Sequence, residues 1–210
     1  EGLLVRVLGP RAAAAFDLEI DTDHNEDFFE LLDLGQQRRV GIRGSSGVAL
    51  ASGLHWYLKH GCNISVAYGA IPLDTTALPS VWPPVSACPV SAGFNATNRT
   101  VRVVSPFRYR YYFNPVAHSY AAWSWDWARW QAEIDFMAMM GVNLPLATTG
   151  QEWVWARVWQ ERFNLTSAEL AEHWPGPAFL AWGRMGNLRG WGGAYPAAGI
   201  TGLTRHWMVQ

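Results

Sequence analysis

The chain has 210 residues, half of them hydrophobic, with 20 Gly and 12 Pro. This is enough apolar material to bury a sizeable core, and the composition excludes a disordered or collagen-like chain. Sixteen Lys and Arg against 17 Asp and Glu leave a formal net charge of −1, so the chain lacks the broad basic field that holds a nucleic-acid backbone. No run approaches the roughly 18 apolar residues that a membrane-spanning helix requires. We therefore expect a globular protein whose partners include neither nucleic acid nor membrane.

The first third of the chain shows the pattern of a small α/β unit. Apolar and polar residues alternate in three short segments, at 16–20, 39–43 and 64–68. A period of two is typical of strands with one buried face, so each segment is predicted to be a strand. Between the last two segments, apolar residues recur at helical spacing from Val48 to Leu58. Ser45 or Ser46 offers the N-cap of this helix, and Gly61 is expected to take the left-handed position that ends it.

A segment of low regularity follows. Residues 72–106 hold six of the 12 prolines and two of the four N-glycosylation sequons, a composition typical of a linker or an exposed insertion. The sequence therefore predicts an N-terminal α/β domain at 1–71, a Pro-rich linker or insertion at 72–106, and a second domain at 107–210.

The second domain contains the clearest helical pattern of the chain. Large apolar residues are spaced four and three apart and lie on one stripe, at Trp123, Trp127, Trp130, Ile134 and Met137. This stripe is expected to be core rather than pocket. Gly141 ends the helix, and 142–147 then predicts a buried strand with Pro145 at an edge or a bulge.

Alternation of helix and strand continues beyond that strand. A helix is predicted over 151–160, and Thr166-x-x-Glu169 has the form of a capping box at the start of another. An extended segment at 108–113 precedes the whole series. Helix, strand, turn and helix in this order form the repeating unit of a parallel α/β sheet or barrel.

Cysteine and histidine give little indication of chemistry. The two cysteines, Cys62 and Cys88, are too few for a disulfide framework and have no spacing typical of a metal or redox motif. They either pair with each other or remain buried thiols, and the sequence leaves both possibilities open. The six histidines show no paired metal-ligand spacing. We expect neither a metal nor a cofactor.

Asparagine is more informative. Four of the eight asparagines stand in N-x-Ser/Thr sequons, namely Asn63, Asn95, Asn98 and Asn164. With Ser and Thr making about a tenth of the chain, roughly one sequon would be expected by chance. Coincidence is one interpretation, and passage through a secretory pathway to a lysosome, a vacuole or the cell exterior is the other. We favour the second interpretation and expect glycans at these asparagines.

Tryptophan is the most over-represented residue. Of the 13 Trp, 11 lie between Trp123 and Trp207. Sugar rings present flat apolar faces ringed by hydroxyls, so a saccharide pocket combines aromatic planes with carboxylates and amides. Aromatic candidates outside the helical stripe are Tyr120, Trp182 and Trp191, and polar candidates are Asn114, Asp126, Gln151 and Glu152. Asp126 fits an acid in the first turn of a helix equally well, whereas Glu152 follows a predicted strand end, where α/β barrels build their sites.

A series of unusual sequence motifs lies between residues 107 and 188. In chain order, these motifs are FRYRYYFN (107–114), SY (119–120), WDWARW (125–130), EID (133–135), GVNLPLA (141–147), GQE (150–152) and GPAFLAWGRMGNL (176–188). They closely resemble the α-N-acetylglucosaminidase family of glycoside hydrolases. The motifs RGSSGV (43–48) and GLHWYL (53–58) also resemble that family's small N-terminal α/β domain. Residues 72–106 and 194–210 match the family poorly.

This resemblance implies both a fold and an activity. The fold would be a small N-terminal α/β domain followed by a (β/α)₈ barrel, here incomplete. The activity would be that of a retaining exo-glycosidase that removes terminal α-linked N-acetylglucosamine from glycans such as heparan sulfate, in lysosomes or equivalent compartments. An oligosaccharide or a glycosaminoglycan is then the expected partner, and whether the full-length protein forms homo-oligomers stays open.

The resemblance also implies which residues of the site this chain holds. The sugar-contacting or pocket-lining positions that it carries over are Asn114, Tyr120, Trp182 and Met185. Val116 stands where some members have Cys, while Gln131 and Phe136 replace Glu and Trp on the helix and are expected to change packing rather than chemistry.

The catalytic residues are expected to be absent from this chain. The family's two catalytic glutamates belong to later barrel strands, and a barrel of about 250 residues cannot be made from the segment after 106. We therefore expect a fragment that is inactive by itself, consisting of the N-terminal domain and the first part of the barrel. The alternative from another class is a non-catalytic carbohydrate-binding protein that keeps the aromatic side of a pocket without the acids.

Overall fold

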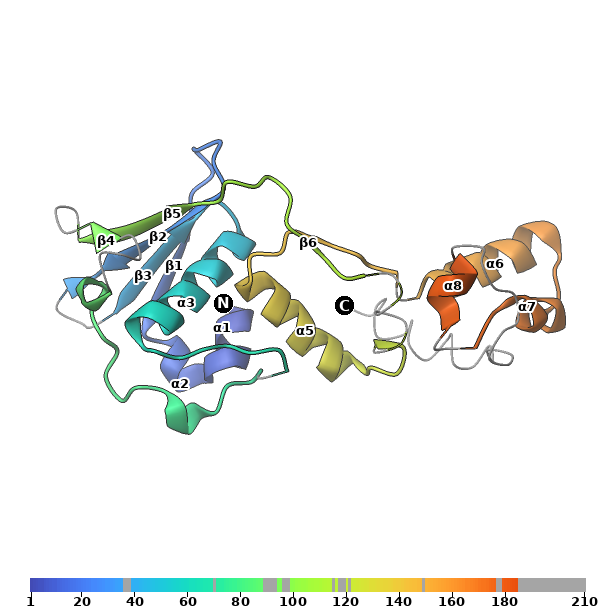
Figure 1. Ribbon diagram of the computed structural model, residues 1–210, viewed down its shortest axis with the longest axis horizontal. Helices are drawn as coiled ribbons and strands as arrows, with labels where there is room; N and C mark the ends of the chain where they lie inside the picture. Colours follow the sequence, from blue (N-terminus) through green and yellow to red (C-terminus); the bar gives the residue numbers. More distant parts are fainter. Residues whose placement is uncertain are drawn as a thin grey trace. The chain divides into compact units, whose positions relative to one another are not determined.

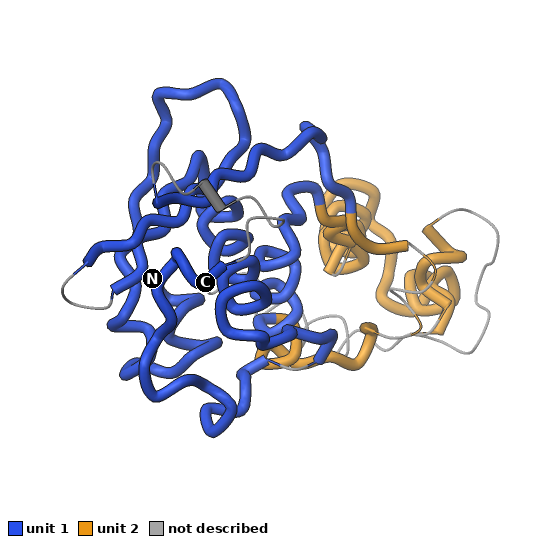
Figure 2. Tube along the Cα trace, turned by 60° about the vertical axis from the view of Figure 1, so that its left-hand side comes forward, with its two compact units in different colours: residues 1–111, 131–144 blue, residues 112–130, 145–210 orange. Residues whose placement is uncertain are grey.

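The structure is a computed structural model of the chain. It describes residues 1–35, 39–69, 71–88, 94–95, 99–114, 116, 120, 122–148, 150–176 and 179–184. The chain forms two compact units, shown in Figure 2, of which unit 1 comprises 1–111 and 131–144 and unit 2 comprises 112–130 and 145–210. None of the helices within the described ranges is long and apolar enough to cross a membrane.

Unit 1 is built on a mixed five-stranded sheet (Figure 1). Its strands are β1 (Phe16–Ile20), β2 (Phe28–Asp33), β3 (Val40–Gly44), β4 (Phe94–Asn95) and β5 (Thr100–Val104). They lie in the order β1-β3-β2-β5-β4, in which β1 runs parallel to β3 and the other pairs are antiparallel. The strands predicted at 16–20 and 39–43 are therefore confirmed as β1 and β3.

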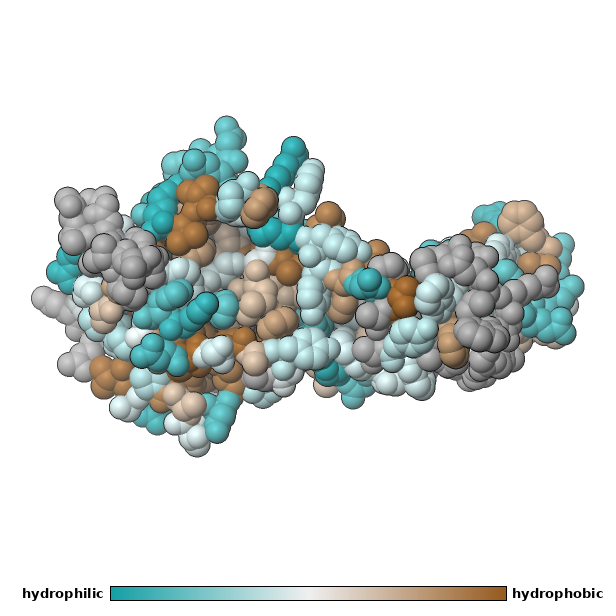
Figure 3. All heavy atoms as spheres, viewed as in Figure 1, coloured by the Kyte–Doolittle hydropathy of each residue, from teal (hydrophilic) through white to brown (hydrophobic). Residues whose placement is uncertain are grey.

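Helix α3 (Gly47–Gly61) covers one face of this sheet. The Ser46 hydroxyl accepts a hydrogen bond from the Ala49 amide, which confirms the predicted N-cap. A Cβ added at Gly53 would lie 2.8 Å from Cγ2 of Ile42, so glycine allows the helix to approach the strand closely. The helix residues that enter the core include Leu54, Tyr57 and Leu58. On the visible face of unit 1, Figure 3 shows hydrophobic side chains interspersed with hydrophilic ones.

The other face of the sheet carries a row of alternating charges. Across β1, β3, β2 and β5 the register places Glu19 opposite Arg43, Arg43 opposite Glu30, and Glu30 opposite Arg102. Arg43 also forms an ion pair with the carboxylate of Asp21. Each cross-strand pair of opposite charges contributes about 0.2–1 kcal/mol. The sheet thus has one apolar and one charged face, as is common for largely antiparallel sheets.

An ion pair between an exposed arginine and a buried aspartate joins two helices of unit 1. Helix α1 (Gly2–Leu8) carries Arg6, and Asp135 lies on the part of α5 (Trp127–Met139) that belongs to this unit. The Arg6 Nε and Nη2 atoms each donate to one carboxylate oxygen of Asp135 at 2.6 Å. Asp135 is 2% exposed, and the pairing raises the pKa of Arg6. Between α1 and β1 the chain forms the short helix α2 (Pro10–Ala13).

Two local predictions for unit 1 are wrong. Residues 64–68 form no strand, although Val66 is buried and both of its neighbours are exposed or partly exposed. The segment packs one side against the core without pairing to the sheet, and such one-sided burial produces the same period of two as a strand. Gly61 remains helical, and the left-handed residue after α3 is Asn63, with φ 58°. Asparagine tolerates this conformation because its short polar side chain bonds locally.

The segment at 72–106 contributes to unit 1. It contains β4, β5 and two 3₁₀ helices, η2 (Thr75–Ala77) and η3 (Val85–Ala87). Val85 and Cys88 are buried in the core, and the Tyr57 hydroxyl donates to the carbonyl of Pro83. Irregular, proline-rich backbone therefore completes the core of this unit.

Strands β6 (Tyr111–Tyr112) and β7 (Leu144–Pro145) form a separate two-stranded sheet. The Leu144 amide donates to the Arg110 carbonyl, and the Leu146 amide donates to the Tyr112 carbonyl. The donors advance by two residues from Leu144 to Leu146 while the acceptors advance by two residues from Arg110 to Tyr112, so the two strands are parallel. With α5 between them in sequence, they form a β-α-β unit. The strand predicted at 142–147 is shorter than expected and is not buried, because Leu144 is 46% exposed.

Among its described residues after β7, unit 2 contains α6 (Gln151–Phe163), α7 (Ser167–His173) and α8 (Leu180–Arg184). The predicted capping box at the start of α7 is confirmed. The Glu169 amide donates to the Thr166 hydroxyl at 3.3 Å, and the Thr166 amide donates to the Glu169 carboxylate at 2.8 Å. A second apolar cluster holds these helices together through stacked rings, at Trp155, Trp159 and Trp174.

The two cysteines provide a test of the core of unit 1. Both are free thiols, and burial raises the pKa of each to about 11. A raised pKa lowers the thiolate fraction at neutral pH, so at pH 8 we expect alkylation by iodoacetamide to be roughly a hundredfold slower than for a thiol of ordinary pKa, and to accelerate up to about pH 11. Mass spectrometry of the folded chain across this pH range measures the rate, with urea-unfolded chain as the control. Equal rates for the folded and unfolded chains at pH 8 would contradict this burial.

Candidate carbohydrate-binding site

Unit 2 contains the residues that the sequence singles out as sugar-contacting. Asn114, Tyr120 and Trp182 are all described there. Met185 and Trp191 lie outside the described residues.

Tyr120 and Trp182 are brought together although 62 residues separate them in the chain. The Trp182 indole Nε1 donates a hydrogen bond to the Tyr120 hydroxyl oxygen at 2.7 Å. The Phe179 ring meets the Tyr120 ring edge to face, with centroids 6.0 Å apart and planes at 85°. Tyr120 remains 46% exposed and Trp182 is partly exposed. We call Tyr120, Phe179 and Trp182 the aromatic wall, a set of rings held in place and open to a ligand.

Asn114 lies in the loop immediately after β6. Its side-chain oxygen accepts a hydrogen bond from the Val116 amide at 2.8 Å, and Phe113 before it has a positive φ of 82°. The asparagine side chain therefore bonds to the backbone two residues further on, as asparagine commonly does in turns. Asn114 is exposed, and its convergence with the aromatic wall on one sugar stays a prediction.

Glu152 lies in the first turn of α6, after Gly150 with φ 85°. Its carboxylate accepts a hydrogen bond from the Arg184 Nε at 2.6 Å, and the two side chains are only 5% and 11% exposed. Arg184 is in α8, two residues after Trp182. The pair therefore ties the helix that carries Trp182 to the beginning of α6. The sequence predicted Glu152 as a polar partner of a sugar, but in the structure this carboxylate is engaged by the guanidinium and positions α8.

Arg184 is the residue of this site that sequence reasoning missed. It lies 32 residues from Glu152, and no periodic pattern relates positions at such a distance. The one indication in the sequence is that Arg184 is a charged residue in the largely apolar segment 176–188. Burial of one charge requires a partner of opposite sign, because an isolated buried charge is strongly unfavourable.

The structure also shows the roles of Asp126 and of the tryptophans in and before helix α5. Asp126 is the N-cap of α5, because its side-chain oxygen accepts from the Arg129 amide at 2.8 Å; this matches the helix-terminal alternative rather than sugar binding. Trp130 is buried against the rings of Phe113 and Trp125, so this part of the stripe is core as expected. Trp123 is exposed and precedes the helix.

The exposed or partly exposed groups of the candidate site are aromatic rings, a phenol and an amide. Partly exposed aromatic planes can stack on the apolar face of a sugar ring, while a phenol and an amide offer hydrogen bonds to its hydroxyls. Over the described ranges, no three His, Cys, Asp or Glu side chains cluster closely enough to hold a metal ion.

A mixed α/β domain followed by a parallel β-α-β unit places the chain among α/β proteins, and the β-α-β unit is the repeating element of a barrel. Two family models match the chain. The alpha-N-acetylglucosaminidase N-terminal domain covers residues 1–84, and the alpha-N-acetylglucosaminidase TIM-barrel domain covers residues 110–204. The chain belongs to the alpha-N-acetylglucosaminidase family.

Individual relatives agree with this assignment. Human alpha-N-acetylglucosaminidase is 43% identical over 198 residues, which are 92% of this chain and 24% of the human protein. A family 89 glycoside hydrolase from Clostridium perfringens in complex with PUGNAc superposes with a TM-score of 0.80 at 34% identity, over 98% of this chain and 21% of that one. The same comparison with a doubly Glu-to-Gln substituted form, in complex with its substrate GlcNAc-alpha-1,4-galactose, gives a TM-score of 0.83 at 33% identity. The chain thus spans about a quarter or less of these relatives.

The Glu152–Arg184 pair provides a test of the site's architecture. We expect Glu152→Gln to lower the free energy of unfolding by about 3 kcal/mol, since the buried guanidinium loses its counter-charge. Glu161→Gln is the matched control, because the Arg157–Glu161 pair has the same N–O distance of 2.6 Å but is exposed; its loss should cost about 0.5 kcal/mol or less. Urea unfolding of both variants measures the difference. Equal effects would show that burial of the Glu152 pair contributes nothing.

Proposed function

We propose that this chain is the N-terminal part of a retaining exo-glycosidase that removes terminal α-linked N-acetylglucosamine from glycans such as heparan sulfate. In this assignment the aromatic wall lines the pocket for the terminal sugar. One observation carries the proposal: in a chain of this family, Tyr120 and Trp182 are joined by a hydrogen bond and remain open to a ligand. The related hydrolase that was solved with GlcNAc-alpha-1,4-galactose makes an N-acetylglucosamine-terminated glycan the first substrate class to test.

The catalytic acids are proposed to lie outside this chain. A retaining mechanism needs two carboxyl groups about 5 Å apart, one as nucleophile and one as acid and then base. Of the four buried carboxylates that the structure describes, Asp21, Asp135 and Glu152 each form an ion pair with an arginine. The resemblance assigns the reacting pair to glutamates of later barrel strands, and the substrate complex of the bacterial relative carries two Glu-to-Gln substitutions. The chain alone would therefore bind the sugar without cleaving it.

The alternative function is that of a carbohydrate-binding protein without catalysis. The observation in its favour is the same engagement of Glu152, which leaves the aromatic wall as a binding element. Turnover by the full-length protein separates the two, because a binding protein lacks the pair of reacting carboxyl groups.

In the full-length protein, Trp182→Ala is expected to lower kcat/KM for an aryl α-N-acetylglucosaminide by roughly tenfold to 200-fold, since an aromatic contact with the sugar is lost in the transition state. Phe163→Ala is the control, because this ring is also an exposed aromatic of unit 2 but lies at the end of α6. Steady-state kinetics measures both variants. An unchanged kcat/KM for Trp182→Ala, or any turnover by the 210-residue chain alone, would contradict the proposal.

The proposed location is a lysosome, a vacuole or the cell exterior, and the sequons provide the test. Asn63 and Asn164 are exposed at the ends of α3 and α6, with φ of 58° and 56°, whereas the side chains of Asn95 and Asn98 lie outside the described residues. We expect mass spectrometry of chain made in a secretory host to find glycopeptides at Asn63 and Asn164. Asn164→Gly is the control that removes the sequon and keeps the left-handed backbone. Unmodified asparagine at both sites would contradict the expectation.

A further inference from the structure

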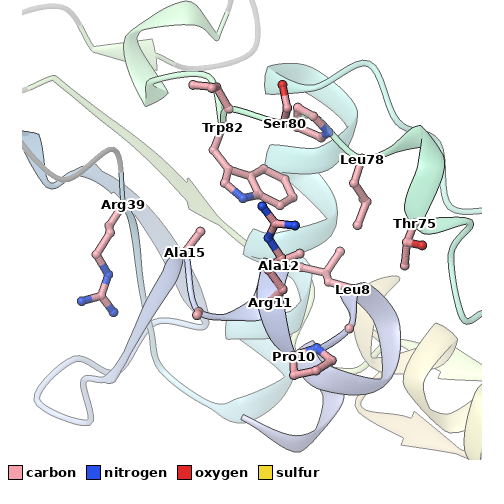
Figure 4. Close-up of a pocket in the computed structure, with 14 residues that line it drawn as sticks. Leu8, Pro10, Arg11, Ala12, Ala15, Arg39, Thr75, Leu78, Ser80 and Trp82 are labelled. Atoms are coloured by element: carbon pink, nitrogen blue, oxygen red, sulfur yellow. The ribbon is translucent and has the colours of Figure 1, made fainter.

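Unit 1 contains a cavity of about 1060 Å³ that the proposed function does not use. It lies between the α1–α2 segment and the irregular stretch from Thr75 to Trp82, as the close-up in Figure 4 shows. Its apolar lining comes mainly from Leu8, Pro10, Leu78 and Trp82. The volume exceeds that needed for a single sugar residue, and lies at the upper end of ordinary ligand pockets.

The charge of the lining has one sign. Two arginines, Arg11 and Arg39, line the cavity, and no Asp or Glu does. Arg39 forms an ion pair with Asp17, whereas Arg11 is exposed and forms no ion pair with any residue that the structure describes. Figure 4 shows the Arg11 side chain extending towards the segment of Ser80 and Trp82. The cavity is therefore complementary to an anion.

An aromatic plane lies in the same lining. The Trp82 indole packs edge to face on Phe16, with centroids 4.9 Å apart and planes at 72°, and contacts the ring of Tyr57 at 6.2 Å. These contacts hold the ring in place while part of it lines the cavity. Hydroxyl groups of Thr75 and Ser80 complete the lining. A fixed aromatic plane, hydroxyls and a guanidinium are together the groups that bind a sugar ring with an acidic substituent.

We propose that this cavity binds an acidic saccharide, with the sugar ring against Trp82 and its carboxylate or sulfate on Arg11. This second site shares no residue with the aromatic wall of unit 2. The proposal of this second site rests on the proposed function in one respect, because the proposed function makes a glycan the partner of the protein. A neutral glycan would leave the guanidinium of Arg11 without a counter-charge, and a purely apolar ligand would leave the hydroxyls unused.

The test is isothermal titration of the 210-residue chain with three probes, namely a heparin tetrasaccharide, a hyaluronan tetrasaccharide and methyl α-N-acetylglucosaminide. The first carries sulfate and carboxylate, the second only carboxylate, and the third no charge, so the first two distinguish the acidic group. Arg11→Ala is expected to weaken the acidic probes by about tenfold, as removal of a charged hydrogen bond does. Arg162→Ala, an exposed arginine of unit 2, is the control and should leave their affinity unchanged.

Two further variants separate this site from the aromatic wall. Trp82→Leu should weaken the tetrasaccharides but not inorganic sulfate, and circular dichroism checks that the variant is folded. Trp182→Ala should abolish binding of the neutral probe and leave binding of the acidic probes unchanged. Failure of the proposed function would therefore show only in the titration with methyl α-N-acetylglucosaminide. The proposal is overturned if Arg11→Ala binds the tetrasaccharides as the parent chain does. It is equally overturned if Trp182→Ala abolishes their binding, or if an acidic peptide such as hexaglutamate binds with the same dependence on Arg11.

Discussion

Parallel pairing of β6 with β7 is the constraint on which the candidate site depends. The hydrogen bonds from Leu144 to Arg110 and from Leu146 to Tyr112 make both strands run in the same direction, so both end at the same edge of their small sheet. In the sequence, Asn114 and Tyr120 follow β6 by two and eight residues, and Glu152 follows β7 by seven residues. In barrels this edge is where ligands bind, because the loops that follow the strands gather there.

Two of the four buried acids among the described residues join helices of the fold. Asp135 holds α1 against α5, and Glu152 holds α8 against the start of α6, each through an arginine. In each pair the arginine compensates the charge of a carboxylate whose burial would otherwise be unfavourable.

Local patterns predicted much of the fold, and long-range contacts account for most of what was missed. The N-cap of α3 and the capping box of α7 are decided by residues three apart, so their sequence signature is direct. Strand β2 escaped prediction because its two phenylalanines, Phe28 and Phe29, are both buried on opposite faces, which removes the alternation. The segment at 64–68 alternates without joining a sheet. The Tyr120–Trp182 contact joins residues 62 positions apart, a separation over which no local sequence pattern acts.

The most direct test of the account is whether the aromatic wall contacts N-acetylglucosamine. Two-dimensional nuclear magnetic resonance of the chain with ¹⁵N-labelled tryptophan reports each indole N–H, and the variant Trp182→Phe assigns the resonance of Trp182. Titration with methyl α-N-acetylglucosaminide should shift this resonance, because the indole N–H that donates to Tyr120 belongs to the aromatic wall. The resonance of Trp130, which is buried in the core, should stay in place. A Trp182 resonance that does not move at saturating sugar would contradict the account.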